Sequence, residues 1–246
     1  MPLTIPTPTI DFPPRLATIE SWLSLFVCPG DVAELIAFDT IHDDKPCKTA
    51  CGFFDYPHLK SMAREAVRKS GQSKGVYITL NPLVPACLDR RKNCLGMKSR
   101  GVAACDLDVR ERRWIFLDID PVRASGESST DSEKLLAWNR AVQVREWLEK
   151  HWGQPDVVGD SGNGYHLLYK FSEPIILPST EPDPTHQLLL ALSDLFTDST
   201  VAIDVKVSNP WRIIKCPGTQ TKKGKATKVR PHRWSWIVEV NGETDG

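Results

Sequence analysis

The sequence predicts an α+β domain built around a mixed β-sheet. Segments with apolar residues at helical spacing alternate along the chain with short apolar runs that are typical of buried strands. The clearest of these runs is WIFLDID at residues 114–120. The turn SGNG at residues 161–164 predicts a β-hairpin, because Asn-Gly tolerates a positive φ. With 246 residues, 41% of them hydrophobic, the chain is long enough to bury a core without disulfides.

The individual elements follow from apolar spacing and from the residues that start or stop them. The first fourteen residues contain five prolines and predict an extended N-terminal arm, whereas residues 15–246 predict one domain. Thr130 and Glu133 have the spacing of a capping box at the start of a long helix. Helices are expected at residues 15–27, 58–70, 131–151 and 185–196. Strands are expected at residues 32–38, 50–54, 75–82, 114–120, 157–158, 166–171, 201–207, 211–215 and 234–240, and residues 83–113 are expected to be irregular.

The composition limits what the protein can bind. Because 31 Lys and Arg residues balance 31 Asp and Glu residues, affinity for nucleic acid requires a local basic patch. No apolar run approaches the roughly 18 residues that a membrane span needs, so no membrane partner is expected. The seven cysteines are scattered and odd in number, and residues 1–14 lack a signal-peptide pattern. We therefore expect a cytoplasmic protein in a reducing compartment.

Two aspartates at the end of the apolar strand are the first candidates for chemistry. Asp118 and Asp120 are two residues apart, so both carboxylates project from one face, roughly 6.5 Å apart along the backbone. Two such carboxylates repel each other unless a divalent cation neutralises them, and oxygen ligands suit Mg²⁺ or Mn²⁺. The alternative is a pair of solvated acids, and the same DxD pattern also occurs in glycosyltransferases and in haloacid-dehalogenase-type phosphatases.

Three further segments carry candidate polar side chains. Ser161 and His166 flank glycines whose backbone N–H groups can approach a phosphate, although a plain hairpin with a hydrogen-bonded histidine is the alternative. Asp204 is an isolated acid within the apolar VAIDVKV and needs a partner, either a lysine or a metal ion. Farther along, Arg212 and Lys215 can hold phosphates or line a solvated edge.

Taken together, these segments resemble the archaeo-eukaryotic primase superfamily. The resemblance is carried by the hDhD strand, the SGNGYH turn and the strand aspartate followed by NPWRIIKCPGT. It points in particular to the primase–polymerase (PrimPol-like) domains of plasmids, phages and other mobile elements, and it covers about residues 75–233. It implies an archaeo-eukaryotic primase fold, in which an RRM-like catalytic sheet and a smaller N-terminal α/β subdomain enclose a cleft.

The resemblance also implies roles for the candidate residues. The metal-binding carboxylates of the family, which coordinate two Mg²⁺ or Mn²⁺ ions, match Asp118, Asp120 and Asp204. Its contacts to the phosphates of the incoming nucleotide match Ser161 and His166, and His166 is also assigned a catalytic role.

Basic residues of the family that bind the nucleotide are matched less closely. Arg212 and Lys215 occupy such positions, but residues three apart on a regular strand point to opposite faces, and only a bulge lets both reach one ligand. Arg123, just past the second aspartate of the strand, is a further candidate.

We therefore expect a template-directed nucleotidyltransferase, a DNA primase or DNA polymerase that adds nucleotides to a 3′-hydroxyl and synthesises primers. Its partners would be a DNA template and primer, dNTPs or NTPs, and a helicase or other replication module. The alternative is a template-binding replication-initiation module with weak or partner-dependent synthesis. A DxD glycosyltransferase is disfavoured, because its mechanism has no place for SGNGYH or for Asp204.

A basic segment at residues 221–233 predicts DNA contacts. It follows the third motif directly and carries Lys222, Lys223, Lys225, Lys228, Arg230 and Arg233. A solvated loop is the alternative. Trp234 and Trp236 alternate onto one face, where they can stack on bases or pack in the core.

The cysteines do not favour a structural zinc site. Cys47 and Cys51 lie between His42 and His58, but the sequence contains no CxxC pair. Thiols buried in the core are the simpler interpretation.

Overall fold

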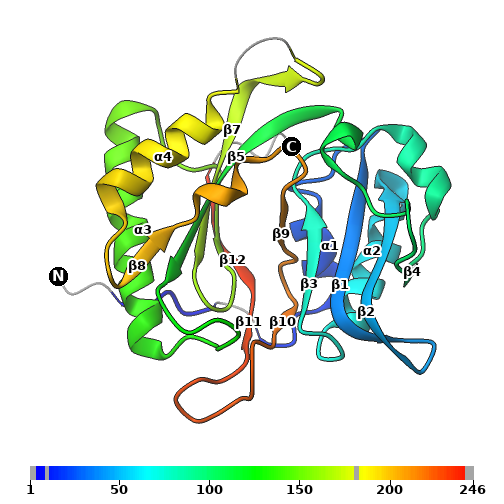
Figure 1. Cartoon of the computed structure of the whole chain (residues 1–246), viewed down its shortest axis with the longest axis horizontal. Helices are drawn as coiled ribbons and strands as arrows, with labels where there is room; N and C mark the ends of the chain where they lie inside the picture. Colours follow the sequence, from blue (N-terminus) through cyan, green and yellow to red (C-terminus); the bar gives the residue numbers. More distant parts are fainter. Residues whose placement is uncertain (1–3, 9–10, 180–182, 242–246) are drawn as a thin grey trace.

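Two five-stranded antiparallel sheets take the place of the single mixed sheet that the sequence predicts (Figure 1). The computed structural model describes residues 4–8, 11–179 and 183–241. The prediction of a mixed sheet is wrong because the long connections do not join neighbouring strands. The helix α3 (Asp131–His151), for example, connects β5 (Glu111–Pro121) to β6 (Val157–Asp160), but β7 (Tyr165–Ile176) lies between these two strands and pairs antiparallel with both.

The first sheet is formed mainly by the N-terminal half of the chain. Its order is β4 (Gly96–Met97), β2 (Lys45–Asp55), β1 (Val32–His42), β3 (Gly75–Thr79) and β9 (Ile213–Lys215). The strands β1 and β2 are longer than predicted because Asp43 and Asp44 both adopt a positive φ, which closes a tight turn between paired His42 and Lys45. The helices α1 (Leu16–Leu23) and α2 (Leu59–Lys69) lie together on one side of this sheet (Figure 1).

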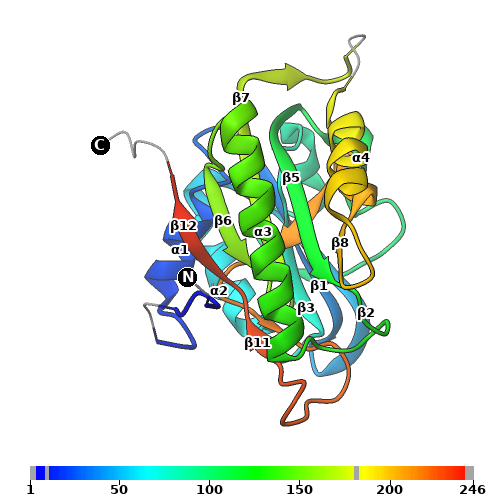
Figure 2. The same ribbon diagram turned by 90° about the vertical axis from the view of Figure 1, so that its left-hand side faces the viewer.

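The second sheet has the order β12 (Trp236–Val240), β6, β7, β5 and β8 (Val201–Ile203). The helix α3 runs along one face of it beside α4 (Thr185–Phe196), as Figure 2 shows. The predicted capping box is confirmed, because the Thr130 side chain accepts a hydrogen bond from the Glu133 amide and the Glu133 carboxylate accepts one from the Thr130 amide. A separate two-stranded ladder joins β10 (Gln220–Thr221) to β11 (Arg233–Trp234).

Further predicted elements differ from the structure in their bounds. The strand expected at residues 234–240 is divided between β11 and β12, β9 begins only at Ile213, and β7 extends to Ile176. The first helix ends at Leu23 rather than residue 27, because the next residues form a tighter turn in which Phe26 N bonds to Leu23 O. The strand expected at residues 201–207 ends at Ile203, where Asp204 caps a short 3₁₀ helix, Val205–Ser208. The segment 83–113 is not wholly irregular, since it contains two 3₁₀ helices, Pro85–Arg90 and Asp106–Asp108, the strand β4 and the start of β5.

One hydrophobic core connects the two sheets. It includes Leu35 and Ile78 of the first sheet and Ile115 and Leu117 of the second, all at most 1% exposed. Although β9 follows β8 in sequence, it crosses to the edge of the first sheet, where it pairs with β3 and adds Ile214 to the same core. Side chains from both halves of the chain therefore line the cleft between the sheets.

The N-terminal arm forms no helix or strand within residues 4–8 and 11–14. Phe12 stacks on Trp234, with ring centroids 5.7 Å apart, and Trp236 is buried, so these tryptophans pack against protein. Within the described parts of the chain, none of the helices combines the length and the apolar character that crossing a membrane requires.

Candidate active site

A cavity of about 300 Å³ opens between the two sheets and gathers most of the predicted site residues. Its lining includes the predicted residues Asp118, Asp120, Ser161, His166, Asp204, Arg212, Lys215 and Lys223. The acids and the histidine come from the second sheet, whereas Lys215 belongs to β9 of the first. The fold therefore brings Lys215 of the first sheet to the cavity that the aspartates of the second sheet line, whereas Lys223 lies beside Asp120 itself.

The three aspartates are brought together by the pairing of β5 with β8. Asp118 and Asp120 alternate with the fully buried Ile119, so both line the cavity while Ile119 lies in the core. Ile119 pairs with Ile203 across the ladder, and the Asp204 amide donates to the Asp118 carbonyl oxygen at 3.0 Å. Asp204 thus lies next to β5 at the strand end, and its carboxylate also accepts a hydrogen bond from the Lys206 amide at 2.9 Å.

Asp118 and Asp120 have different electrostatic surroundings. Burial, together with the negative charges of Asp120 and Asp204, raises the pKa of the Asp118 carboxyl well above its usual range. Asp120 instead lies beside two cations, with its Oδ2 3.3 Å from Arg123 and 4.0 Å from Lys223. The Arg123 side chain is otherwise held by carbonyl oxygens of Pro121 and Glu127, so it acts as a fixed partner of the second carboxylate.

These carboxylates have the chemistry of a site for a hard divalent cation. Three oxygen-donor side chains line one cavity, and a cation there would remove the repulsion that disfavours the ionised form of Asp118. Within the described residues, no group of three or more His, Cys, Asp and Glu side chains is already arranged as a set of metal ligands. The donors therefore fit such an ion in kind, and their side chains would have to move to surround it.

The SGNG turn joins β6 to β7 as predicted, but the residue with the positive φ is not the one predicted. The positive φ falls on Gly162, at 92°, and not on the Asn-Gly pair. Gly164 is required for another reason, because a Cβ there would overlap Asp120 Oδ1 and the carbonyl oxygen of Ile119. The Ser161 hydroxyl accepts a hydrogen bond from the Gly164 amide at 3.0 Å, so this side chain stabilises the turn while it lines the cavity.

His166 lies at the floor of the cavity, paired with Asp118 across the ladder between β5 and β7. It is 7% exposed, its ring packs edge-on against Phe116, and its Nε2 is 3.5 Å from Asp118 Oδ1. Burial lowers the pKa of His166 to about 4. The imidazole is therefore neutral at pH 7 and can donate a hydrogen bond to a phosphate without carrying a charge.

Arg212 and Lys215 both reach the cavity without a bulge in the strand. Only Lys215 belongs to β9, whereas Arg212 precedes it and is oriented by Asn209, whose side-chain oxygen accepts from its Nε at 3.1 Å. Lys215 donates to the Gln220 carbonyl oxygen at 3.0 Å and lies over the ring of Tyr77. Burial lowers the pKa of Lys215 to about 7, so an anion beside it would favour its charged form.

The basic segment does not present all its cations to solvent. Lys222 donates to the Gly71 carbonyl oxygen, and Arg230 forms a two-point ion pair with Glu133 at 2.8 Å and a further contact with Glu127. Lys223 points to Asp120 in the cavity. Lys225 and Lys228 are exposed, and they remain the candidates for contact with DNA.

Sequence analysis missed several residues that line the cavity. Phe38 of β1 and Tyr77 of β3 form its wall in the first sheet, with ring centroids 5.4 Å apart. Asn163 and Thr221 also line it. Alternation along β3 marks Tyr77 as facing away from the buried Val76 and Ile78, but no local signal indicates that β9 and the second sheet lie opposite.

The cysteines are free thiols, and Cys51, Cys87 and Cys216 are buried. Cys47 donates to the Thr49 carbonyl oxygen.

Comparison with known proteins bears on the fold. No family model matches the sequence, and no curated protein matches it. The crystal structure of primase RepB′ is similar over 93% of this chain, with a TM-score of 0.50 and 12% sequence identity. The matched region spans 57% of the RepB′ chain, so this chain covers little more than half of that structure. At this level of identity the similarity concerns the fold alone, and the chain described here therefore has a primase-like fold.

Proposed function

We propose that the protein is a metal-dependent nucleotidyltransferase that extends a DNA strand along a template and synthesises primers. One observation carries the proposal: three carboxylates, a buried histidine and cationic side chains line a single cavity between two sheets. The primase-like fold supports the same assignment. The resemblance of the motifs to PrimPol-like domains adds the expectation that one site serves both priming and extension.

The acidic and the basic side chains of the cavity have different roles in this proposal. Asp118, Asp120 and Asp204 would hold divalent cations, which when bound activate the attacking 3′-hydroxyl and stabilise the leaving pyrophosphate. On the opposite wall, Arg212 and Lys215 supply positive charge for the triphosphate.

The neutral His166 and the turn would contact the nucleotide between these walls. Its imidazole lies beside Asp118, so one phosphate can lie close to both His166 and a cation held by the aspartates. Ser161 lines the same part of the cavity, and its hydroxyl already bonds within the turn. We therefore assign Ser161 to shaping the turn as much as to holding phosphate.

One observation favours a second candidate, a template-binding module with weak synthesis. Asp120 is engaged by Arg123, and the three acids are not arranged as ligands within the described residues. Such a module would bind template and depend on a partner domain for efficient synthesis. The difference between the two candidates is a difference in the rate of incorporation at equal template affinity.

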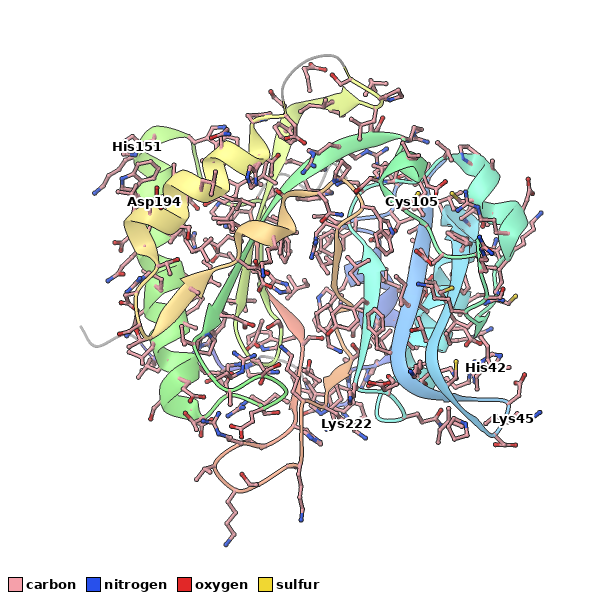
Figure 3. The ribbon with its side chains drawn as sticks, viewed as in Figure 1. His42, Lys45, Cys105, His151, Asp194 and Lys222 are labelled. Atoms are coloured by element: carbon pink, nitrogen blue, oxygen red, sulfur yellow. The ribbon has the colours of Figure 1, made fainter. Side chains whose placement is uncertain are left out.

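The test is incorporation of labelled dNTPs and NTPs on a primed and then an unprimed template, with Mg²⁺ or Mn²⁺. Asp118→Asn, Asp120→Asn and Asp204→Asn should each reduce incorporation by about 10²-fold or more, because each removes charge that the cations need. The matched control is Asp194→Asn, an exposed aspartate on the outer side of α4 that Figure 3 labels far from the cleft. Circular dichroism checks that each variant is folded.

Near-normal incorporation by any of the three variants at saturating Mn²⁺ excludes that aspartate as a metal ligand. Template binding without incorporation by the wild-type protein supports the second candidate. Extension without synthesis on unprimed template restricts the proposal to a polymerase.

A further inference from the structure

A buried ion pair lies directly behind the SGNG turn. Lys134 of α3 and Asp160 at the end of β6 are both 4% exposed, and Lys134 Nζ is 2.5 Å from Asp160 Oδ2. The neighbouring inward positions of the same helix are apolar, including Ala137 and Ala141. Removing two charges from water costs several kcal/mol per ion, and well-packed apolar residues are often as stabilising as a buried pair. Stability alone therefore does not account for charges at this position.

The second oxygen of Asp160 holds the turn. Asp160 Oδ1 accepts a hydrogen bond from the Gly162 amide at 2.6 Å, at the residue whose φ is positive. One oxygen of the carboxylate thus bonds to Lys134 of α3, and the other bonds to the backbone of the turn. The Tyr165 ring, fully buried and 5.1 Å from Lys134 Nζ, closes the other end of the turn.

The opposite side of the turn meets the candidate catalytic residues. Gly164 lies against Asp120 so closely that no Cβ fits between them. Two residues later, His166 pairs with Asp118 across β5 and β7. A displacement of the turn by the length of one hydrogen bond would therefore move both Asp120 and His166 relative to the cations on the other wall.

Neither member of the ion pair touches the cavity itself. Lys134 and Asp160 line a separate hollow of about 330 Å³ behind the turn, together with Trp234 and Trp236. Asp160 also lines a small cavity that it shares with His166 and Lys215, so the pair acts on a bound nucleotide through neighbouring groups and not by direct contact. This separation makes their effect on nucleotide use measurable apart from direct contact with the nucleotide.

We propose that Lys134 and Asp160 are positioning residues, whose buried ion pair sets the SGNG turn so that Ser161 and His166 are presented to the nucleotide beside Asp120. The inference rests on the proposed nucleotidyltransferase function. A charged pair is needed at this position because both oxygens of Asp160 accept hydrogen bonds, one from Lys134 of the helix and one from the Gly162 amide of the turn. An apolar pair would fill the same space and leave the Gly162 amide without its acceptor.

The test compares the double variant Lys134→Met/Asp160→Leu with the wild-type protein. We expect thermal unfolding close to the wild-type temperature, because removal of two desolvated charges offsets the loss of the acceptor for the Gly162 amide. In contrast, kcat/KM for dATP on a primed oligo(dT) template with Mn²⁺ should fall about tenfold to hundredfold, since misplaced catalytic groups lose that much. Affinity for the template in nucleotide-free gels should not change.

Two further variants separate positioning from general stability. Arg145→Met removes a second, partly exposed ion pair farther along α3, where Arg145 bonds Glu239 of β12 at 2.6 Å, and it should leave kcat/KM unchanged. Asp160→Asn keeps an acceptor for Gly162 but weakens the bond to Lys134, so it should raise the KM for dATP severalfold and retain most of kcat. If the double variant does not fold, the KM and kcat of Asp160→Asn alone test the proposal.

Direct binding gives a readout besides activity. We expect dATP with Mn²⁺ to raise the melting temperature of the wild-type protein and of Arg145→Met, but to raise that of Asp160→Asn less. Equal kcat/KM and equal dATP-induced shifts in all folded variants would overturn the inference. Absence of incorporation by the wild-type protein, with the dATP shifts as expected, would contradict the proposed function and leave the positioning of a nucleotide site supported.

Discussion

Burial without an ion-pair partner raises the pKa of an acidic side chain, and this effect extends beyond the cavity. Glu34 of β1 is fully buried, and its Oε2 accepts a hydrogen bond from the Ala104 amide at 3.2 Å. Its Oε1 has no hydrogen-bond partner among the described residues. Burial raises the pKa of Glu34 from 4.5 to about 7, so the carboxyl is protonated in the folded protein at mildly acidic pH.

This raised pKa makes stability depend on pH. Above pH 4.5 the unfolded chain loses the Glu34 proton while the folded protein retains it, so the free energy of unfolding falls as the pH rises toward about 7. Glu34→Gln removes the titrating group. We expect the variant to gain ~3 kcal/mol relative to wild type between pH 4 and pH 8, which urea titrations at these two values would measure.

The control is Glu146→Gln, at an exposed position of α3, whose stability relative to wild type should be the same at both pH values. A constant difference between Glu34→Gln and wild type would show that the pKa of Glu34 is the same in the folded protein as in the unfolded chain, and not raised.

At the scale of elements, the basic loop between β10 and β11 is attached to the molecule at its base. Figure 1 shows it projecting beyond the sheets, and Figure 3 labels Lys222 at its start. Lys222 is tied to Gly71, Arg230 is tied to Glu133, and Gly224 lies so close to the Gly126 carbonyl oxygen that a Cβ would overlap it. These contacts leave the tip with its two exposed lysines as the part available to a polyanion.

We expect Lys225→Ala/Lys228→Ala to weaken binding of duplex DNA similarly for all sequences. Each lysine that neutralises a phosphate contributes about 0.9 to the slope of log affinity against log salt, so the slope should flatten by about two. Fluorescence anisotropy over a salt series measures this slope. The KM for the nucleotide should remain that of the wild-type protein, because neither side chain lines the cavity.

The matched control is Lys45→Ala/Lys48→Ala, which removes two exposed lysines from the β1–β2 hairpin, where Figure 3 labels Lys45 away from the loop. A slope that both double variants leave unchanged would exclude the loop and direct attention to the basic side chains of residues 90–113.

At the scale of the whole molecule, the two sheets share the main hydrophobic core, and a smaller second cluster around Phe53 and Leu83 is separate from it. Ile214 of β9 lies in the same buried cluster as Ile78 beside it and Leu117 of the second sheet. Along the chain, β8 of the second sheet comes before β9, which forms the edge strand of the first sheet. Neither sheet is therefore assembled from a continuous part of the chain.

We expect the molecule to unfold in one cooperative transition, with far-UV circular dichroism and tryptophan fluorescence changing together in guanidinium chloride. Ile214→Ala should lower the free energy of unfolding by about 2–5 kcal/mol and shift both signals equally. Ile176→Ala, at a position that is 63% exposed, should change it by less than about 0.5 kcal/mol. Two separated transitions, with Ile214→Ala moving only one, would mean that the sheets unfold independently.

Features that depend only on residues close together in the chain could be predicted from the sequence. The capping box of α3, the hairpin around SGNG and the common face of Asp118 and Asp120 were all predicted correctly, because each follows from spacing within one turn or one strand. The third aspartate was found as an isolated acid, but its position at a strand end depends on the cap that it forms for the next helix.

Contacts between distant segments became known only from the three-dimensional structure. The convergence of Arg212 and Lys215, the neutrality of His166 and the capture of Lys222 and Arg230 by protein groups depend on segments far apart in the sequence. The antiparallel order of both sheets has the same origin, since β7 enters between β5 and β6 and β9 crosses to the first sheet. The physical reason is that periodicity reports which face of an element is buried, whereas pairing, burial of charge and pKa are set by whatever packs against that face.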